Sequence, residues 1–254
     1  MSSAADSRPP LDRSVLAGLP GFHVEVLEET ASTNVVCADR AREGAPEWTV
    51  VVAEHQTAGR GRLDRSWELP ARSGLAFSVL VRPHVSPARW GWLSLVTGLA
   101  VAEAIVPDAT VKWPNDVLLG GRKVCGILSE LVTTGSTTGA ILGIGINVDM
   151  TADELPVPTA TSLALAGITT SRTVLLTSVL LRLRHRIAEL TTFTEAELIR
   201  AYAARSATIG SAVSVSMPDG TVIEGLAEGI DGDGRLLIGG RAINAGDVVH
   251  ARLT

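Results

Sequence analysis

The chain has 254 residues, of which 46% are hydrophobic and 19% are charged, and its formal net charge is −5 at pH 7. This length permits one large domain, or a domain of about 200 residues with a smaller companion, and the composition excludes a largely disordered chain. The acidic balance argues against a protein that works mainly by coating nucleic acid, because neutralising phosphates requires a basic surface.

The cysteine content and the apolar runs bear on where the protein works. Cys37 and Cys125 form no C-x-x-C pair, so we expect neither a disulfide framework nor a zinc knuckle. The polar start of the sequence has no apolar core of a signal peptide. The longest apolar run, residues 90–105, is shorter than the roughly 20 residues of a membrane span. We therefore expect a cytoplasmic protein with no membrane partner.

Hydrophobic patterning predicts the elements of the first 150 residues. A strand is expected near residues 22–27, and then a helix over residues 33–43, with Ser32 or Thr33 as its cap. The apolar run 90–105 is typical of a buried helix, which Pro107 would end. Six further runs, rich in apolar and β-branched residues, are expected as strands: residues 48–53, 75–81, 111–113, 117–119, 123–132 and 140–148.

The hydrophobic periodicity changes within residues 172–254. Residues 172–190 and 194–205 have helical spacing, and Thr194 with Glu197 fits a capping box at the start of the second helix. From Val213 onward, apolar and polar residues alternate between turns rich in glycine and aspartate. Short strands separated by turns predict a small all-β barrel over residues 207–254.

Glycine and arginine alternate directly after the strand expected at residues 48–53. Gly59 and Gly61 would let backbone N–H groups approach an anion, and Arg60 and Arg62 would supply paired donors for phosphate or carboxylate. A loop at the end of a buried strand is also a favoured ligand site. Taken alone, the pattern fits a solvated loop or an RNA-binding tail equally well, and it is not a P-loop.

A second polar stretch, Lys112-Trp113-Pro114-Asn115-Asp116, follows another short strand. Pro114 favours an extended conformation for the residue before it and a bend that presents Asn115 and Asp116. The aspartate could hold a cation, orient a nucleophile or accept a proton. The same residues also suit an ordinary turn.

Lysine 123 lies just past Gly120-Gly121, which is expected as a hairpin turn. It could protect an exposed sheet edge or face a ligand anion as a partly desolvated cation. Together with Arg60, Arg62 and Lys112 it gives four cations in two stretches of an acidic chain, which suggests a polyanionic ligand such as a nucleotide. Asn147, after the glycine-containing strand, could read a base edge or cap that strand.

Four motifs occur in order along the chain. They are E-x-Q-x-A-G-R-G-R at residues 54–62, K-W-P-N-D at 112–116, R-K-x-x-G-I-L-x-E at 122–130 and G-I-G-I-N at 143–147. In order and spacing they resemble the biotin–protein ligases, and the resemblance covers nearly the whole chain. Several motifs in order are far more specific than any one of them.

This resemblance implies an α+β fold, a mixed β-sheet with flanking helices of the class II synthetase-like type, followed by a small SH3-like β-barrel. It makes residues 1–206 the catalytic domain and residues 207–254 the barrel. The implied enzyme uses ATP to convert biotin to biotinyl-5′-AMP. It then transfers biotin to a lysine of a biotin carboxyl carrier domain of acyl-CoA or pyruvate carboxylases. Mg²⁺ is implied as a bridge between phosphates, and its protein ligands are unknown.

The resemblance also assigns roles. Because two anions must meet in the first step, positioned cations should contribute most to catalysis. Lys123 would contact carboxylate and phosphate, Arg62 would belong to a loop that shields the adenylate from water, and Asp116 would orient or deprotonate the incoming lysine. The implied biotin-binding residues are Ser32, Thr33, Asn34, Gln56, Arg60, Gly61, Arg62 and Lys123. The implied ATP-binding residues are Arg60, Arg62, Lys112, Asn115, Lys123 and Asn147.

Two departures from the family pattern bear on these expectations. Many members have a third glycine in the Gly/Arg loop where this chain has Asp64, which tolerates unusual backbone angles less well than glycine. The sequence before the first strand is also too short for the DNA-binding domain of the repressor-type members, so we expect no DNA partner.

Two alternatives compete with this interpretation. Lipoate ligases and octanoyltransferases share the catalytic fold, although the R-R-x-S-G-G-G motif of lipoate ligases is absent. A non-enzymatic nucleic-acid-binding or adaptor protein could use the Gly/Arg loop and the barrel, but the acidic balance and the few aromatic residues count against it.

Overall fold

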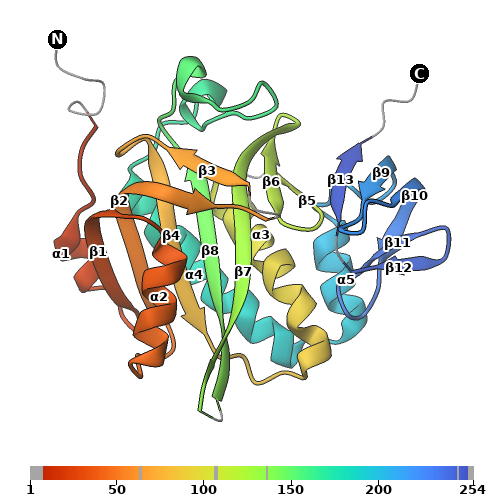
Figure 1. The fold of residues 1–254 in the computed structure, drawn as a ribbon, viewed down its shortest axis with the longest axis horizontal. Coiled ribbons are helices and arrows are strands. Elements are labelled where there is room, and N and C mark those ends of the chain that lie inside the picture. The colour runs from red at the N-terminus through yellow and green to blue at the C-terminus, as the bar shows by residue number, and fades with distance from the viewer. Residues whose placement is uncertain (1–7, 63–64, 106–107, 136, 245, 251–254) are drawn as a thin grey trace. The chain divides into compact units, whose positions relative to one another are not determined.

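The structure is a computed structural model that describes residues 8–62, 65–105, 108–135, 137–244 and 246–250 (Figure 1). The chain divides into two compact units. The first unit comprises Met1–Arg82 and Leu119–Leu181, and the second comprises Pro83–Leu118 and Arg182–Thr254. Each unit is therefore built from segments that are separated in sequence, and the chain passes between the units after Arg82, Leu118 and Leu181.

A mixed β-sheet forms the centre of the first unit. Its strand order is β1-β2-β4-β8-β7, in which β1 is parallel to β2 and the other neighbours are antiparallel. A short additional strand, β3, forms a hairpin with the end of β2. The strands are β1 (His23–Thr30), β2 (Thr49–Arg60), β3 (Ser66–Leu69), β4 (Gly74–Val81), β7 (Arg122–Thr134) and β8 (Thr137–Asn147). The expectation of a mixed sheet is confirmed.

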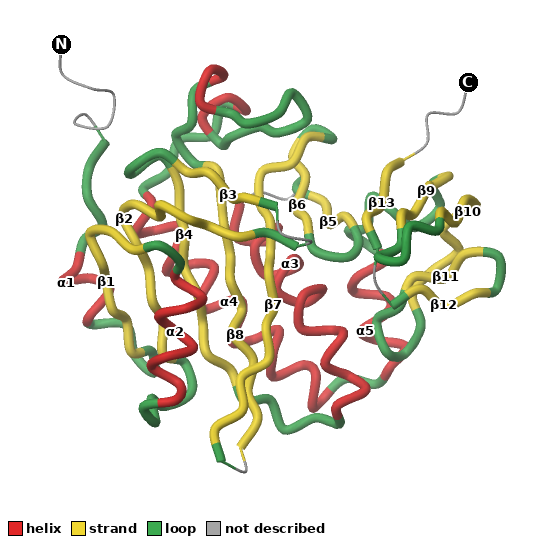
Figure 2. Tube along the Cα trace, in the orientation of Figure 1, coloured by secondary structure: helices red, strands yellow, loops and turns green. Residues whose placement is uncertain are grey.

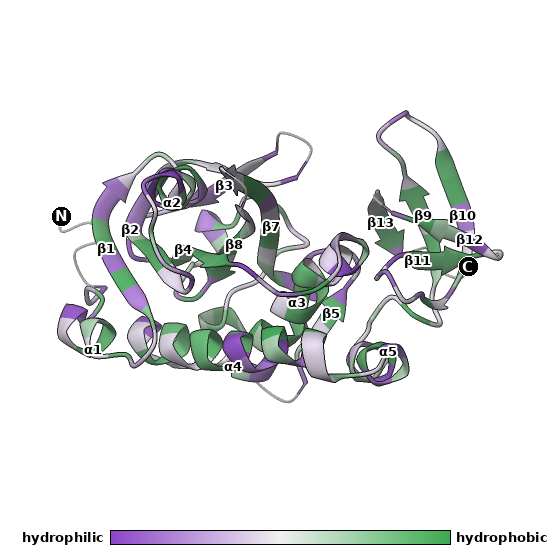
Figure 3. Ribbon diagram, turned by 90° about the horizontal axis from the view of Figure 1, so that it is seen from below, coloured by the Kyte–Doolittle hydropathy of each residue, from purple (hydrophilic) through white to green (hydrophobic). Residues whose placement is uncertain are grey.

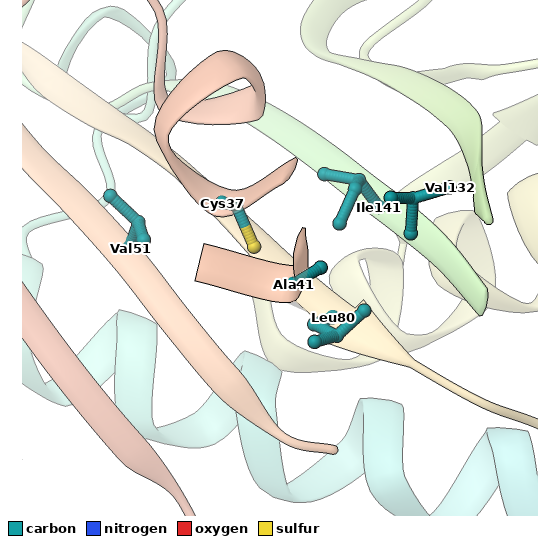
Figure 4. Packing of buried hydrophobic residues seen from close by; sticks show 6 residues of the cluster. All are labelled: Cys37, Ala41, Val51, Leu80, Val132 and Ile141. Atoms are coloured by element: carbon teal, nitrogen blue, oxygen red, sulfur yellow. The ribbon is translucent and has the colours of Figure 1, made fainter. Parts of the chain in front are cut away.

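Helices of the first unit cover this sheet. α2 (Thr33–Arg42) lies on one side of the strands and α4 (Arg172–Thr192) on the other (Figures 2 and 3), while α1 (Arg13–Ala17) precedes β1. Figure 4 shows how α2 packs: Cys37 and Ala41 of the helix meet side chains from four strands, namely Val51, Leu80, Val132 and Ile141. This apolar contact holds α2 against one face of the sheet.

The second unit combines helices with a second sheet. Its helices are η2 (Pro87–Gly91), α3 (Trp92–Ile105), the end of α4, and α5 (Glu195–Ala203). A two-stranded hairpin, β5 (Thr110–Lys112) with β6 (Asp116–Leu119), carries the K-W-P-N-D motif at its turn. The second sheet has the order β12-β11-β10-β9-β13 and contains β9 (Ala212–Ser216), β10 (Val222–Ile230), β11 (Leu236–Ile238), β12 (Arg241–Ile243) and β13 (Asp247–His250).

This C-terminal sheet is open over the residues that the structure describes. Within them, β12 pairs only with β11 and β13 only with β9, so the expectation of a closed barrel is corrected to an SH3-like antiparallel sheet of five strands. The strands are three to nine residues long, and the two outer strands, β12 and β13, have three and four residues.

The aromatic residues of the second unit hold α3 and α5 to this sheet. The Trp92 ring meets the Tyr202 ring edge-on, with 6.4 Å between centroids. The Trp92 Nε1–H donates to the carbonyl of Gly232 at 2.8 Å, and the Trp113 Nε1–H donates to the carbonyl of Gly234 at 3.1 Å. Both indoles are almost fully buried, so these two bonds satisfy donors that have no access to water.

Most expected elements are confirmed within one or two residues, including the capping box of Thr194 and Glu197. Ser32 occupies the N-cap position of α2, but its side chain makes no capping hydrogen bond in the described structure. The Gly/Arg segment was expected to be a loop, and this is wrong for Gly59 and Arg60, because β2 continues through them and pairs with β3. Elements α1 and β3 were not predicted, and Pro107 lies outside the described residues.

Two further expectations concern the whole chain. No helix among the described residues is long and apolar enough to cross a membrane. The domain boundary at residues 206/207 stays a prediction, since the two compact units divide the chain at other positions.

Candidate active site

Glycines form the sheet surface next to the start of α2. Gly126 of β7 pairs with Gly145 of β8, and Gly143 pairs with Leu128 two residues further along. A Cβ atom built on any of these three glycines would collide with a neighbouring side chain, which is Trp67 at Gly126 and Gly145 and Asn34 at Gly143. We call Gly126, Gly143 and Gly145 the glycine floor, because they allow other groups to lie directly on the sheet backbone.

The indole ring of Trp67 lies on this floor. The Nζ of Lys123 is 5.5 Å from the ring centroid, which is a cation–π geometry. The Trp67 Nε1–H has no hydrogen-bond acceptor among the described residues. Because Gly59 pairs with Trp67 across the β2–β3 hairpin, the Gly/Arg segment is held beside Trp67 and hence beside Lys123.

The Gly/Arg segment turns back at the end of that hairpin. Arg60 pairs with Ser66, and the Gly61 N–H donates to the Arg65 carbonyl at 2.6 Å. Arg60 is exposed and Arg62 is half-buried. The departure at Asp64 lies outside the described residues. Within the first unit, therefore, the backbone of this arginine-bearing segment and Lys123 approach the same tryptophan.

Four buried polar side chains form a hydrogen-bond network next to the glycine floor. The Thr33 N–H donates to Gln56 Oε1 at 2.9 Å, and the Thr33 hydroxyl lies 3.2 Å from the same oxygen. The Ser78 hydroxyl lies 2.8 Å from Thr33 Oγ1 and 2.6 Å from Asn34 Oδ1. Asn34 Nδ2 donates to the Glu130 carboxylate. The structure thus brings together Thr33, Asn34 and Gln56, and Ser32 is buried at the adjoining position.

Residues 159–161 form hydrogen bonds with both Lys123 and Asn147. The Lys123 N–H donates to the Thr159 carbonyl at 2.9 Å, and the Thr161 N–H donates to the Lys123 carbonyl at 2.8 Å. The Thr161 carbonyl in turn accepts from Asn147 Nδ2 at 2.9 Å. The N–H and the carbonyl of Lys123 are therefore both bound by residues 159–161, and the buried Asn147 amide is oriented by the same segment.

The remaining predicted residues, Lys112, Asn115 and Asp116, lie together in the second unit on the β5–β6 hairpin. Lys112 and Asp116 are paired across the two strands, and the peptide bond between Trp113 and Pro114 is cis. The Trp113 N–H donates to Thr208 Oγ1 at 3.0 Å. The C-terminal segment therefore supports this hairpin from within the same unit.

Charges on this hairpin affect two titratable groups nearby. Burial raises the pKa of Tyr202 above its usual value, and the negative charge of Asp116 raises it further. Burial lowers the pKa of His250, and the positive charge of Lys112 adds to that decrease. Asp116 and Lys112 thus lie close enough to the buried Tyr202 of α5 and the half-buried His250 of β13 to shift their pKa values.

Sequence reasoning assigned no role to Trp67, Ser78 or Thr161. Ser78 is the single polar residue in the apolar run GLAFSVLV, and Trp67 follows the Gly/Arg segment. Glycines at alternate positions of a strand, as in G-I-G-I-N, put both on one face of the sheet. Together these signals could have indicated a surface on which a ring lies against the backbone.

The comparisons with known proteins agree with this geometry. The family model described as "Biotin/lipoate A/B protein ligase family" matches residues 26–147, and the one described as "Biotin protein ligase C terminal domain" matches residues 208–251. A biotin–[acetyl-CoA-carboxylase] ligase of Mycobacterium tuberculosis is 42% identical, over 96% of this chain and 97% of its own length. The bifunctional ligase/repressor BirA of Escherichia coli is 35% identical, over 89% of this chain and 72% of its own.

A solved structure is similar as well. The biotin protein ligase from Aquifex aeolicus, in complex with biotin and ATP, superimposes with a TM-score of 0.75 at 30% identity, covering 91% of this chain and 99% of that one. Fold and matched families together define a ligase of the biotin/lipoate class. The chain belongs to the biotin–protein ligase family. The expected family, the enzyme class and the α+β fold are confirmed.

Proposed function

We propose that this chain activates biotin with ATP to biotinyl-5′-AMP and then transfers biotin to a lysine of a biotin carboxyl carrier domain. The observation that carries the proposal is the position of Lys123, whose ammonium group lies over Trp67 beside the glycine floor. A cation held there is suited to a ligand that joins a flat ring to an acid group. Relatives named as biotin–[acetyl-CoA-carboxylase] ligases support the same substrate and acceptor.

The chemistry explains why cations are needed. In the first step an oxygen of the biotin carboxylate attacks the α-phosphorus of ATP, an acyl–phosphate bond forms, and pyrophosphate leaves. Two groups of like charge must meet, so a positioned ammonium lowers the barrier by stabilising the charge that builds up between them. In the second step the amine of a carrier lysine attacks the acyl carbon, and AMP leaves.

Each predicted residue has a place in this scheme. Lys123 would contact the carboxylate and the α-phosphate, while Arg60, Gly61 and Arg62 would close over the adenylate and exclude water. Ser32, Thr33, Asn34 and Gln56 would bind the neutral ureido ring, whose N–H groups and carbonyl need both acceptors and donors. Lys112, Asn115 and Asn147 would contact the nucleotide, and Asp116 would orient or deprotonate the incoming lysine.

Three further assignments belong to the same proposal. Mg²⁺ would enter with ATP and bridge phosphate oxygens. We assign it no protein ligand, since no group of three or more His, Cys, Asp or Glu side chains comes together in the described part of the chain. The acceptor would be the carrier domain of an acyl-CoA or pyruvate carboxylase. The location would be the cytoplasm, and the absence of a DNA partner stays a prediction.

The test is biotin-dependent exchange of pyrophosphate into ATP by the Lys123→Ala variant. Removing the ammonium should lower the exchange rate by a factor on the order of 10²–10³, the usual effect of deleting a donor aimed at developing charge. The melting temperature should change little, because Lys123 is only half-buried. Arg122→Ala is the matched control, since it removes a neighbouring exposed cation.

Substrate choice is tested in the same assay with lipoate in place of biotin. Pyrophosphate exchange that occurs with lipoate but not with biotin would show that the proposed substrate is wrong. A Lys123→Ala variant that forms adenylate at the rate of the unmodified protein would contradict the proposed role of Lys123.

A further inference from the structure

Ser78 is a buried polar residue that none of the steps above uses. It lies in the middle of β4, where its neighbours across the sheet are Val51 and Gly143. Its side chain is completely buried, and a buried hydroxyl is costly unless it is hydrogen-bonded. Among the described residues its hydroxyl has hydrogen-bond contacts with the side chains of Thr33 and Asn34, both of which the proposed function places on the biotin ring.

The direction of the hydrogen bonds follows from counting protons. Asn34 Nδ2 already donates to the Glu130 carboxylate and to the Leu128 carbonyl at 3.4 Å, so Asn34 Oδ1 is the atom that faces Ser78. An amide oxygen can only accept. The single proton of the Ser78 hydroxyl therefore goes to Asn34 Oδ1, over 2.6 Å.

The Thr33 hydroxyl is then constrained in turn. Its oxygen is 2.8 Å from Ser78 Oγ and 3.2 Å from Gln56 Oε1. Since the Ser78 proton is already used, the 2.8 Å contact is favourable only if Thr33 donates its proton to Ser78. Thr33 Oγ1 can then only accept a hydrogen bond from a ligand.

Gln56 is oriented in the opposite sense. Its Oε1 accepts the Thr33 N–H at 2.9 Å, so the amide nitrogen points away from Thr33. A Cβ atom at Gly59 would meet that nitrogen. The Gln56 amide nitrogen therefore lies on the side of the Gly/Arg segment. Thr33 thus offers an acceptor and Gln56 a donor, in fixed places.

We propose that Ser78 is a positioning residue for substrate recognition: it sets the polarity of Thr33 and Asn34, so that the enzyme accepts a ring N–H at Thr33 and rejects a ring oxygen there. This inference rests on the proposed function and deepens it. The substrate class that fits is a cyclic urea, which carries N–H groups on both sides of a carbonyl. The isosteric cyclic carbamate, with one N–H replaced by oxygen, would set two lone pairs against each other.

The experiment compares the affinities of the parent and of Ser78→Ala for biotin and for the two carbamate analogues of biotin, by calorimetry. In the parent, one carbamate should bind roughly a hundredfold more weakly than biotin, since a lost hydrogen bond with opposed acceptors is a large penalty. In Ser78→Ala the Thr33 hydroxyl can rotate and donate to the ring oxygen. The preference for biotin over that carbamate should then fall by about tenfold or more.

A second readout separates positioning from catalysis. Transfer of biotin from preformed biotinyl-5′-AMP to a carrier domain should keep its kcat in Ser78→Ala, while the KM for biotin in adenylate formation rises. Ser73→Ala is the matched control: Ser73 is equally buried, and its hydroxyl donates to the Pro70 carbonyl outside the network. It should leave the biotin/carbamate ratio unchanged.

The possible outcomes are distinct. If the parent binds and activates biotin but Ser78→Ala keeps the parent ratio, the role of Ser78 is wrong. If the parent neither binds nor activates biotin, the proposed function itself fails. Should Ser78→Ala not fold, Ser78→Cys retains the volume with a weaker donor. It must show the same direction of change in the ratio, and an unchanged ratio would overturn the inference.

Discussion

The glycine floor is the residue-scale feature that the motifs do not explain by themselves. At Gly145 a Cβ atom would come within 2.7 Å of Cζ2 of the Trp67 ring, so an alanine there must displace the ring. We expect Gly145→Ala to weaken biotin binding by about tenfold to a hundredfold, the equivalent of an overpacking cost of roughly 1–3 kcal/mol. Titration calorimetry with biotin measures this directly.

A matched glycine exists elsewhere in the chain. A Cβ atom at Gly229 of β10 would meet no heavy atom within 4 Å, so Gly229→Ala should bind biotin like the parent. Equal biotin affinity in Gly145→Ala and Gly229→Ala would contradict the idea that a ring lies against the sheet backbone at Gly145.

A second residue-scale prediction concerns pH. Burial between α2 and the sheet, together with the charge of Glu25, raises the pKa of the Cys37 thiol from 9.0 to about 12. Above pH 9 the unfolded chain releases this proton while the folded protein retains it, so the free energy of unfolding falls as pH rises towards 12. Below pH 9 this effect is absent.

Denaturant unfolding of the parent and of Cys37→Ala, at about pH 8 and about pH 10.5, isolates this contribution. The decrease in the free energy of unfolding between the two pH values should be smaller in Cys37→Ala by about 2 kcal/mol, since one proton contributes about 1.4 kcal/mol per pH unit. Equal decreases in both proteins would show that the thiol titrates normally.

At the scale of elements, the β5–β6 hairpin depends on residues far along the chain. The N–H of the buried Trp113 is satisfied by Thr208 Oγ1, which lies in the C-terminal segment of the same unit. In Thr208→Val this acceptor is lost while the side-chain shape is kept. We expect a cost of roughly 1–3 kcal/mol in stability and a faster amide exchange at Trp113 than at other hairpin positions.

Loosening this hairpin should also affect chemistry, because it carries Lys112 and Asp116. Pyrophosphate exchange by Thr208→Val should show a higher KM for ATP. Thr191→Val, on the exposed surface of α4, is the control for the same substitution. If the two variants have equal KM values for ATP, the hairpin is not positioned through Thr208.

The elements that the sequence predicts well are those in which one local pattern decides the outcome. α4 and α5 follow helical periodicity, α2 follows from its cap residues, and β4 and β8 follow from largely apolar runs. β3 was missed, because Ser66–Leu69 is a strand only through its pairing with the end of β2. The role of Ser78 was missed for a similar reason: a lone serine in an apolar strand becomes informative only when its partners, Thr33 and Asn34, are known.

The candidate site divides in the same way. The residues that carry charge stand out in the sequence, since Lys112 and Lys123 are the only lysines of the chain. The orientation of these side chains cannot be read from the sequence. The segment that holds Lys123 and Asn147, residues 159–161, contributes through its backbone, and backbone hydrogen bonds leave little trace in the amino-acid pattern.

At the scale of the whole molecule, the charged residues that the motifs single out are divided between the two compact units. Lys123, Arg60 and Arg62 belong to the first unit, and Lys112 and Asp116 belong to the second. The second unit in turn contains both the K-W-P-N-D hairpin and the C-terminal sheet. A domain boundary at residues 206/207 would therefore cut through a unit whose buried donors are satisfied from the far side of that boundary.

Three buried N–H groups make this concrete. The indoles of Trp92 and Trp113 donate to the carbonyls of Gly232 and Gly234, and the Trp113 backbone donates to Thr208. In a chain that ends at residue 206 each of these N–H groups loses its acceptor. Each loss should lower the free energy of unfolding by roughly 1–3 kcal/mol. The total is comparable with the 5–15 kcal/mol that holds an ordinary domain folded. We therefore expect residues 1–206 to melt on the order of 10 °C or more below the whole chain.

Scanning calorimetry and tryptophan fluorescence of residues 1–206 measure this, with co-expression of residues 207–254 as the control. The added segment should restore the melting temperature and the buried tryptophan emission, because it returns the three acceptors. A chain of residues 1–206 that melts within a few degrees of the parent would show that the C-terminal sheet is an independent domain. The hairpin would then owe its position to contacts other than these three hydrogen bonds.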